Sequence, residues 1–445
     1  MLEWKQRYAV MLGIVLLGTV SIGTPSEARS LTNALINGYG DLQKVYLLNP
    51  PSFCPCALAQ NLASSLSTAT GQAINQDVPI ASVAPAFSYH YNPTLSVFER
   101  SAGMFGPLFA ERGLTLGKGK FNFNIGYAYV GFDDINGTSL DNLKTGPGVL
   151  LTNQTDAAQL RTDLSVQTHV IAPTFRYGIT DRWDIGLVLP ILNTSLRIRN
   201  TTVMVAQQVN PNVGDLTDPA NLRNLRFVAT TPTQVGQRSR FAASATGIGD
   251  IILRSKYNFW GAEDGAAAFG LGLVLPSGDE DNLQGTGDTH VVPSLMLSQV
   301  WWNRFEPHLN LGFDLNANDV ERSSFLYTVG ATVQILRPLA LMIDVIGRTE
   351  FNGLQVNKNK LLSDGLLLDK PINQCTTEAA CSGQQTKVAV FPENFTQRND
   401  IVNFAFGLRY GIGASGSVYF GGVVPINDDG FRADFIPSGG IEYTF

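Results

Sequence analysis

Hydrophobic and polar residues alternate with a period of two along much of the chain from Phe121 onward. In residues 121–129, aromatic and aliphatic side chains take every second position, and Asn, Gly and Ala stand between them. Residues 305–315 repeat the pattern, with Phe, Leu and Pro on one face and Glu, His, Asn, Gly and Asp on the other. Because side chains on a β-strand point to opposite faces in turn, each segment predicts a strand with one apolar face. A soluble sandwich and a barrel in lipid both contain such strands, so alternation alone does not separate them.

The lengths of the connections favour the barrel, because short and long links alternate. Bacterial outer-membrane barrels have short periplasmic turns, longer external loops and an even number of strands. We predict an all-β fold: a transmembrane, antiparallel, up-and-down β-barrel of about 12 strands whose polar face lines the lumen. The longer links are expected at 133–163, 199–246, 277–289, 317–322, 351–398 and 426–434. The strands are expected at 121–132, 164–177, 183–198, 247–260, 266–276, 290–302, 305–316, 323–335, 339–350, 399–410, 414–425 and 435–445.

The N-terminal part has a different organisation. Lys5 and Arg7 precede an apolar run, and Ser26 and Ala28 place small residues at the −3 and −1 positions of a cleavage site, which predicts a signal peptide at 1–28. An uncleaved anchor is the alternative, although the run is shorter than the ~20 residues that a spanning helix needs. Scattered prolines and one short amphipathic helix at 57–70 predict a mostly irregular or short-helical extension. We therefore expect a periplasmic or plug segment at 29–120 and an outer-membrane β-barrel at 121–445.

The C-terminus and the composition support this fold. Ile441, Tyr443 and Phe445 alternate at the end of the chain, a pattern that resembles the signal read by the barrel assembly machinery. Charged residues make up 15% of the chain, against about 25% in soluble proteins. The 10% of aromatic residues argues against a disordered chain. A net charge of −6 argues against nucleic-acid binding.

A basic residue followed by Tyr recurs at 176–177, 256–257 and 409–410, and the strand that follows each pair ends in Pro. Tyr fits the aromatic girdle of a barrel, and Pro fits a strand end because it cannot donate to the ladder. Shared constraints on hairpins explain this repeat better than duplication does.

Three segments carry a resemblance to a known family. Residues 247–257 contain G-x-G-D, residues 273–279 contain L-P-x-G-D, and residues 307–313 form the strand P-H-L-N-L-G-F. In this order they resemble the outer-membrane barrels grouped as "putative MetA-pathway of phenol degradation", over roughly residues 165–445. The resemblance implies a transporter-like barrel that passes aromatic or other hydrophobic molecules.

The lumen face contains the candidate functional residues. Both signs of charge are present, which argues against a strongly ion-selective pore and leaves a structural charge network as the alternative. By alternation these residues are Asp250, Arg254, Lys256, Glu306, His308, Asp314, Asp344, Arg348 and Arg409.

Other chemistry has weaker support. Disulfides are plausible in an exported chain, with Cys375–Cys381 as a small loop and Cys54 and Cys56 as a tight ring or a metal ligand pair. The acidic run 279–281 could bind Ca²⁺ or be a solvated charge cluster. We expect no resident metal and no cofactor. No Ser stands two residues after any of the four His, which removes the signature of outer-membrane phospholipases and favours a protein that is not an enzyme.

We therefore expect a channel in the bacterial outer membrane for small hydrophobic or aromatic solutes. The alternative is a structural or ligand-binding barrel with a filled lumen and functional external loops. The expected partners are outer-membrane lipid and lipopolysaccharide, the barrel assembly machinery and a small-molecule solute, with no nucleic acid.

Overall fold

The structure is a computed structural model of the whole chain. It describes residues 30–33, 86–92, 97–100, 104–135, 137–150, 156–208, 227–234, 239–261, 265–355, 366–368, 386–388 and 395–445. The expected signal peptide, the expected helix at 57–70 and all four cysteines lie outside these residues. No helix in the described part of the chain is long and apolar enough to cross a membrane.

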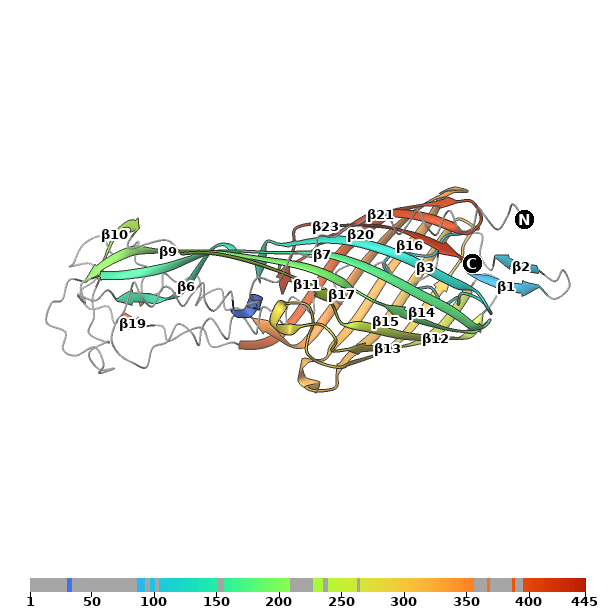
Figure 1. The fold of residues 1–445 in the computed structure, drawn as a ribbon, viewed down its shortest axis with the longest axis horizontal. Helices are drawn as coiled ribbons and strands as arrows, with labels where there is room; N and C mark the ends of the chain where they lie inside the picture. Colours follow the sequence, from blue (N-terminus) through green and yellow to red (C-terminus); the bar gives the residue numbers. More distant parts are fainter. Residues whose placement is uncertain are drawn as a thin grey trace.

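Twelve antiparallel strands form a closed barrel, as predicted (Figure 1). Each strand pairs with its neighbour in the chain, and the last strand pairs with the first, from Ser438 opposite Ala128 to Thr444 opposite Asn122. The wall therefore closes without a free edge. Its strands are β3 (Phe121–Phe132), β7 (Asp156–Thr180), β8 (Trp183–Val188), β12 (Ile251–Gly261), β13 (Gly265–Leu275), β14 (His290–Gln299), β15 (Phe305–Asn316), β16 (Ser324–Leu336), β17 (Leu339–Gln355), β20 (Phe395–Ile412), β21 (Gly416–Pro425) and β23 (Ile436–Thr444).

Two strands that the sequence predicts as continuous are interrupted, and this part of the prediction is wrong. The predicted strand 183–198 is divided at Pro190 into β8 and β9 (Ile191–Gln208). The predicted strand 247–260 is divided after Gly249 into β11 (Ser239–Ile248) and β12. The first break lies at Pro190 because proline has no N–H group to donate to the ladder. The second break includes Asp250, whose carboxylate accepts hydrogen bonds from backbone N–H groups of the loop after β13.

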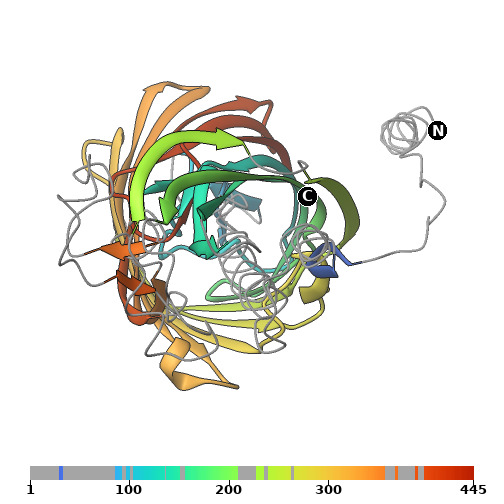
Figure 2. The ribbon, with the colours of Figure 1, turned by 90° about the vertical axis from the view of Figure 1, so that its left-hand side faces the viewer.

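The predicted loops 133–163, 199–246 and 351–398 also contain strands, which is a second correction. Strands β7 and β9 pair far beyond the barrel wall, and β6 (Asp141–Leu150), β10 (Phe227–Gln234) and β11 join them. Figures 1 and 2 show this extension at the end of the barrel that carries the long links. Shorter strands in these links are β4 (Asp134–Ile135), β5 (Thr138–Ser139), β18 (Leu366–Leu368) and β19 (Thr386–Val388). The regular hydrogen-bonding pattern of β7 and β9 continues after the apolar alternation ends, so hydrophobic periodicity did not reveal it.

The two faces of the wall differ as the alternation predicts. On β3, Asn122 and Asn124 are buried on the lumen side, whereas Phe121 and Tyr127 are exposed on the outer side. Ile441, Tyr443 and Phe445 are also exposed on the outer side. The structure therefore has an apolar outer surface around a lumen with buried polar groups, as in a barrel in lipid.

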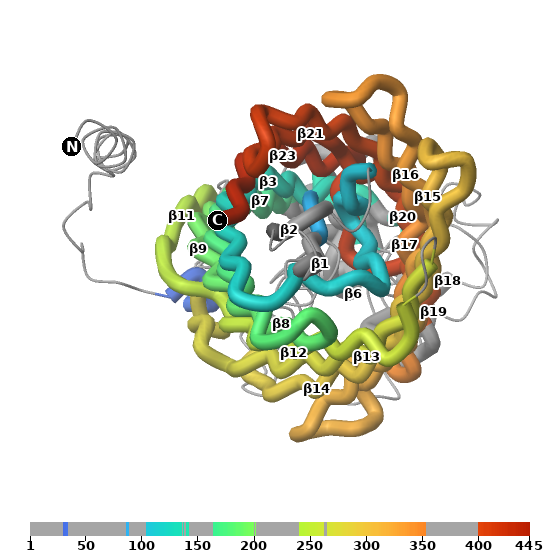
Figure 3. The backbone as a smooth tube through the Cα atoms, turned by 90° about the vertical axis from the view of Figure 1, so that its right-hand side faces the viewer, coloured from blue at the N-terminus to red at the C-terminus, as the bar shows by residue number. Residues whose placement is uncertain are grey.

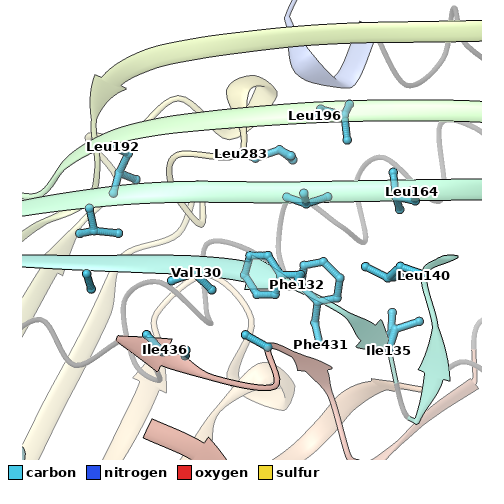
Figure 4. Packing of buried hydrophobic residues seen from close by; sticks show 14 of the residues in the cluster. Val130, Phe132, Ile135, Leu140, Leu164, Leu192, Leu196, Leu283, Phe431 and Ile436 are labelled. Carbon is cyan, nitrogen blue, oxygen red and sulfur yellow. The ribbon is translucent and has the colours of Figure 1, made fainter. Parts of the chain in front are cut away.

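Near the long-link end the lumen side becomes apolar. Val130, Phe132 and Leu164 pack there with Phe431, and the rings of Phe132 and Phe431 stack with their centroids 4.0 Å apart (Figure 4). Leu283, from the loop between β13 and β14, joins the same cluster. The lumen is thus apolar at the long-link end and becomes charged toward the end with the short turns.

Candidate functional site

Residues 104–120, the lumen segment, lie inside the barrel. In Figure 3 the cyan tube of this segment crosses the opening at the short-turn end. Its backbone N–H groups donate to side chains of the wall: Glu111 N to Asn310 Oδ1 at 2.6 Å, Gly113 N to Ser298 Oγ at 3.1 Å, and Leu116 N to Asp184 Oδ2 at 3.0 Å. Side chains of the wall therefore satisfy these groups in the place of a ladder.

Close approach of the lumen segment requires small residues. A Cβ atom on Gly178 of β7 would overlap the carbonyl oxygen of Gly117. A Cβ atom on Gly113 would overlap the backbone of Ala266 in β13. Leu108 and Leu116 of the segment are fully buried. The contact between the segment and the wall is therefore tightly packed as well as hydrogen-bonded.

One carboxylate of the lumen segment meets three cations of the wall. Glu111 Oε1 lies 2.7 Å from Arg254 Nη1, and Glu111 Oε2 lies 3.6 Å from both Arg176 Nη2 and Lys256 Nζ. Burial alone would raise the pKa of Glu111, but the positive charges of Arg176, Lys256 and Arg254 outweigh it and lower the pKa from 4.5 to about 2. Glu111 is therefore ionised at neutral pH.

Asp184 of β8 completes this cluster from the wall. Its carboxylate lies 3.9 Å from Arg176 Nε and 4.0 Å from Lys256 Nζ. Lys256 Nζ also donates to the carbonyl oxygen of Leu114 at 2.8 Å. We name Glu111, Asp184, Arg176, Arg254 and Lys256 the charge cluster. It contains three cations and two carboxylates, which leaves one positive charge in excess.

Other buried charges of the lumen form closed pairs. Arg112 Nη2 lies 3.1 Å from Glu306 Oε2, and Arg348 Nη2 lies 2.9 Å from Glu350 Oε1. Arg409 Nη1 lies 3.4 Å from a carboxylate oxygen of Glu442. These pairs match the structural network that was the alternative for the lumen charges, since a buried charge is costly without a partner.

Two histidines lie beside carboxylates: His290 of β14 beside Asp314 of the adjacent strand β15, and His308 of β15 beside Asp344 of β17, across Gly330 of β16. His290 Nδ1 lies 2.8 Å from Asp314 Oδ1, and His308 Nε2 lies 2.5 Å from Asp344 Oδ1. All four side chains are buried. Each pair fixes the orientation of an imidazole ring, the first against the adjacent strand and the second across one intervening strand.

A cavity of about 240 Å³ lies against the charge cluster. Val188, Ile252, Val274 and Val292 form an apolar part of its lining, and Phe109 of the lumen segment also borders it. The charged groups of its lining are Glu111, Arg176, Asp184, Arg254, Lys256, Asp314 and Arg348, together with His290. The cavity therefore combines an apolar surface with charged groups, an arrangement that suits a small amphipathic ligand.

The predicted lumen residues fall into three groups. Arg254, Lys256, Asp314 and Arg348 line the cavity. Glu306, His308, Asp344 and Arg409 are buried outside its lining. Asp250 binds the loop after β13, where its carboxylate accepts hydrogen bonds from Gly278 N at 3.0 Å and Thr286 N at 2.8 Å.

Sequence reasoning missed three members of the charge cluster. Arg176 stands in the basic-Tyr repeat, and Asp184 follows from the alternation of β8, so both had a signal in the sequence. Glu111 lies in a segment without periodicity, and only the folded chain brings it to its partners.

The acidic run 279–281 has a structural role. The Asp279 side chain accepts a hydrogen bond from Asp281 N and caps the short helix η3 (Glu280–Asn282). Within the described ranges, no three His, Cys, Asp or Glu side chains are grouped to hold a metal ion.

Comparisons with solved structures find distant similarity. The chain is similar to the COG4313 outer membrane channel from Pseudomonas putida F1, with 10% identity, a TM-score of 0.40, and coverage of 75% of this chain and 98% of that one. It is also similar to a Pseudomonas aeruginosa FadL homologue, with 10% identity, a TM-score of 0.30, and coverage of 85% and 96%. It is similar to the CymD monoaromatic hydrocarbon channel as well, with 10% identity, a TM-score of 0.28, and coverage of 74% of this chain and 88% of that one. Similarity at this level does not transfer a function.

The sequence itself matches one family model. No curated protein matches the chain. Residues 153–336, less than half of the chain, match the family described as "Putative MetA-pathway of phenol degradation". All three segments that carried the resemblance lie within this match, which ends with the last residue of β16. Residues 153–336, with Arg176, Asp184, Arg254 and Lys256 of the charge cluster, therefore match the family of "putative MetA-pathway of phenol degradation" proteins, the family that the three sequence segments resemble.

Proposed function

We propose that the protein is a channel in the bacterial outer membrane that passes small hydrophobic or aromatic solutes. The observation that carries the proposal is the cavity inside the closed barrel wall. Its apolar valine and isoleucine lining would favour a ring or alkyl group. The family description, with its reference to phenol degradation, agrees with an aromatic solute.

The two ends of the lumen support a directional path. The buried cluster of Val130, Phe132 and Leu164 at the long-link end would give apolar surroundings to a hydrophobic solute that displaces part of it. The charge cluster and the lumen segment lie closer to the end of the barrel with the short turns. In this proposal the lumen segment is a plug that must shift for a solute to pass, because it fills the space beside the cavity.

Uptake by cells tests the proposal. Porin-deficient bacteria that express the full chain should take up labelled phenol several times faster than cells without it, and labelled glucose no faster. Val292→Trp fills the cavity from its lining and should reduce phenol uptake, whereas Val329→Trp adds the same ring on the exposed outer side and should not. Equal uptake by both variants, or no phenol uptake by the parent chain, contradicts the channel.

A binding barrel with a filled lumen is the second candidate, and the tight packing of the lumen segment favours it. Binding of an aromatic compound without any uptake in the same cells would support this candidate over the channel.

A further inference from the structure

The charge cluster has an excess cation that no described side chain neutralises. Among the described residues, the carboxylates that pair with Arg176, Arg254 and Lys256 are those of Glu111 and Asp184. The neighbouring charges are already paired, as the Arg112–Glu306 and Arg348–Glu350 contacts show. An uncompensated charge in a partly dry lumen is unfavourable, so the cluster favours the approach of one more anion.

Arg254 is the cation that an incoming anion can reach. Its side chain is 39% exposed, against 2% for Arg176 and 3% for Lys256. An arginine carries five N–H donors. Among the described residues, Arg254 uses one nitrogen, Nη1, for Glu111. The rest of the guanidinium group lines the cavity and retains donors for a planar acceptor.

The rest of the cavity limits the size and the polarity of the ligand. Val188, Ile252 and Val274 form an apolar patch in the same cavity as Arg254. Sites for drug-sized ligands measure roughly 300–1,000 Å³. At about 240 Å³, this cavity holds a single ring or a short chain.

We propose that the cavity binds a small amphipathic carboxylate, with its carboxylate on Arg254 and its ring or chain on the valine and isoleucine patch. The proposal deepens the proposed function, on which it rests, by naming organic anions as the preferred solutes over neutral aromatics. Arg254 then has two carboxylate partners, the ligand and Glu111 of the lumen segment.

Substitutions of the two residues in the Arg254–Glu111 contact test the proposal, because they should change the binding of an anion in opposite directions. The probes are benzoate and its neutral counterpart benzyl alcohol, titrated into the purified full chain by calorimetry in detergent. Benzoate should bind about tenfold more tightly than benzyl alcohol, the difference expected from one charge-assisted hydrogen-bonded contact. Arg254→Gln should remove this preference, and Arg254→Lys should keep most of it.

Glu111→Gln provides the sharper result. It removes a negative charge beside Arg254, so benzoate should bind several times more tightly to this variant, while the neutral benzyl alcohol should bind no more tightly than to the parent chain. A merely damaged site would weaken both probes. Arg322→Gln, at an exposed position on the long-link side, is the matched control and should leave both affinities unchanged.

Each outcome decides between the proposals. Equal affinity for the two probes, or the same affinities in Arg254→Gln and Arg322→Gln, overturns the carboxylate site. Phenol uptake by cells without a benzoate preference leaves the channel and rejects the carboxylate site. A benzoate preference that Arg254→Gln removes, without uptake of any aromatic, establishes the site and rejects the channel.

Discussion

Replacing Glu111 with Gln should weaken the attachment of the lumen segment to the barrel wall. Glu111 is the only acidic residue of residues 104–120, and its carboxylate contacts Arg176, Arg254 and Lys256. Docking lowers its pKa from 4.5 to about 2. At about 1.4 kcal/mol per pKa unit, the ionised carboxylate contributes about 3.5 kcal/mol to docking, or roughly 300-fold in the equilibrium between docked and undocked states.

Hydrogen exchange measures this equilibrium directly. The N–H groups of Glu111, Gly113 and Leu116 donate to wall side chains and should exchange only when the segment undocks. In the Glu111→Gln variant, peptides covering 104–120 should exchange up to about 300-fold faster at pH 7, whereas peptides of β15 should be unchanged.

The control is Glu321→Gln, which removes an exposed carboxylate at the long-link end. Exchange in 104–120 that stays within threefold of the parent chain in both variants would refute the reasoning. The lumen segment would then be held by packing, and the charge cluster would contribute little to docking.

Three further predictions follow from other contacts. Because docking lowers the pKa of Glu111, its contribution should be constant from pH 7 to about pH 5 and be lost as the pH falls from there to 2, so exchange in 104–120 corrected for intrinsic rates should rise only in acid. Asp250→Asn should speed exchange in residues 277–288 about tenfold without opening the barrel, because its carboxylate accepts the N–H groups of Gly278 and Thr286. Phe445→Ala should reduce the heat-modifiable barrel in outer-membrane fractions severalfold while refolding in detergent continues, and equal amounts in the membrane would contradict an assembly signal.

The sequence predicted the barrel wall well because each strand has one face toward the lumen and one toward the outside, and the alternation of polar and apolar residues follows these two faces. Strands β3 and β15 begin and end at the predicted residues. Asp250 shows the limit of this reasoning. Its polar side chain fits the lumen face of a continuous strand, but in the folded chain it binds the loop after β13 and interrupts the strand.

The charge cluster shows a second limit. Its wall members have positions fixed by strand register, so Arg254 and Lys256 could be assigned to the lumen from sequence. The position of Glu111 depends on where an irregular segment lies within a finished barrel. No local pattern encodes that placement, because its hydrogen bonds go to side chains far away in the sequence, such as Asn310.

The direct pairing of β23 with β3 has a consequence for the attachment of the lumen segment. Phe121 and Phe445 exchange backbone hydrogen bonds at the seam, and none of the described residues of 86–120 takes part in the pairing of β23 with β3. The cations that contact Glu111, in contrast, come from β7 and β12, which stand on either side of β8 in the formed wall. The wall therefore closes through contacts that do not include the lumen segment, so loss of the Glu111 contacts would free the segment without breaking the seam.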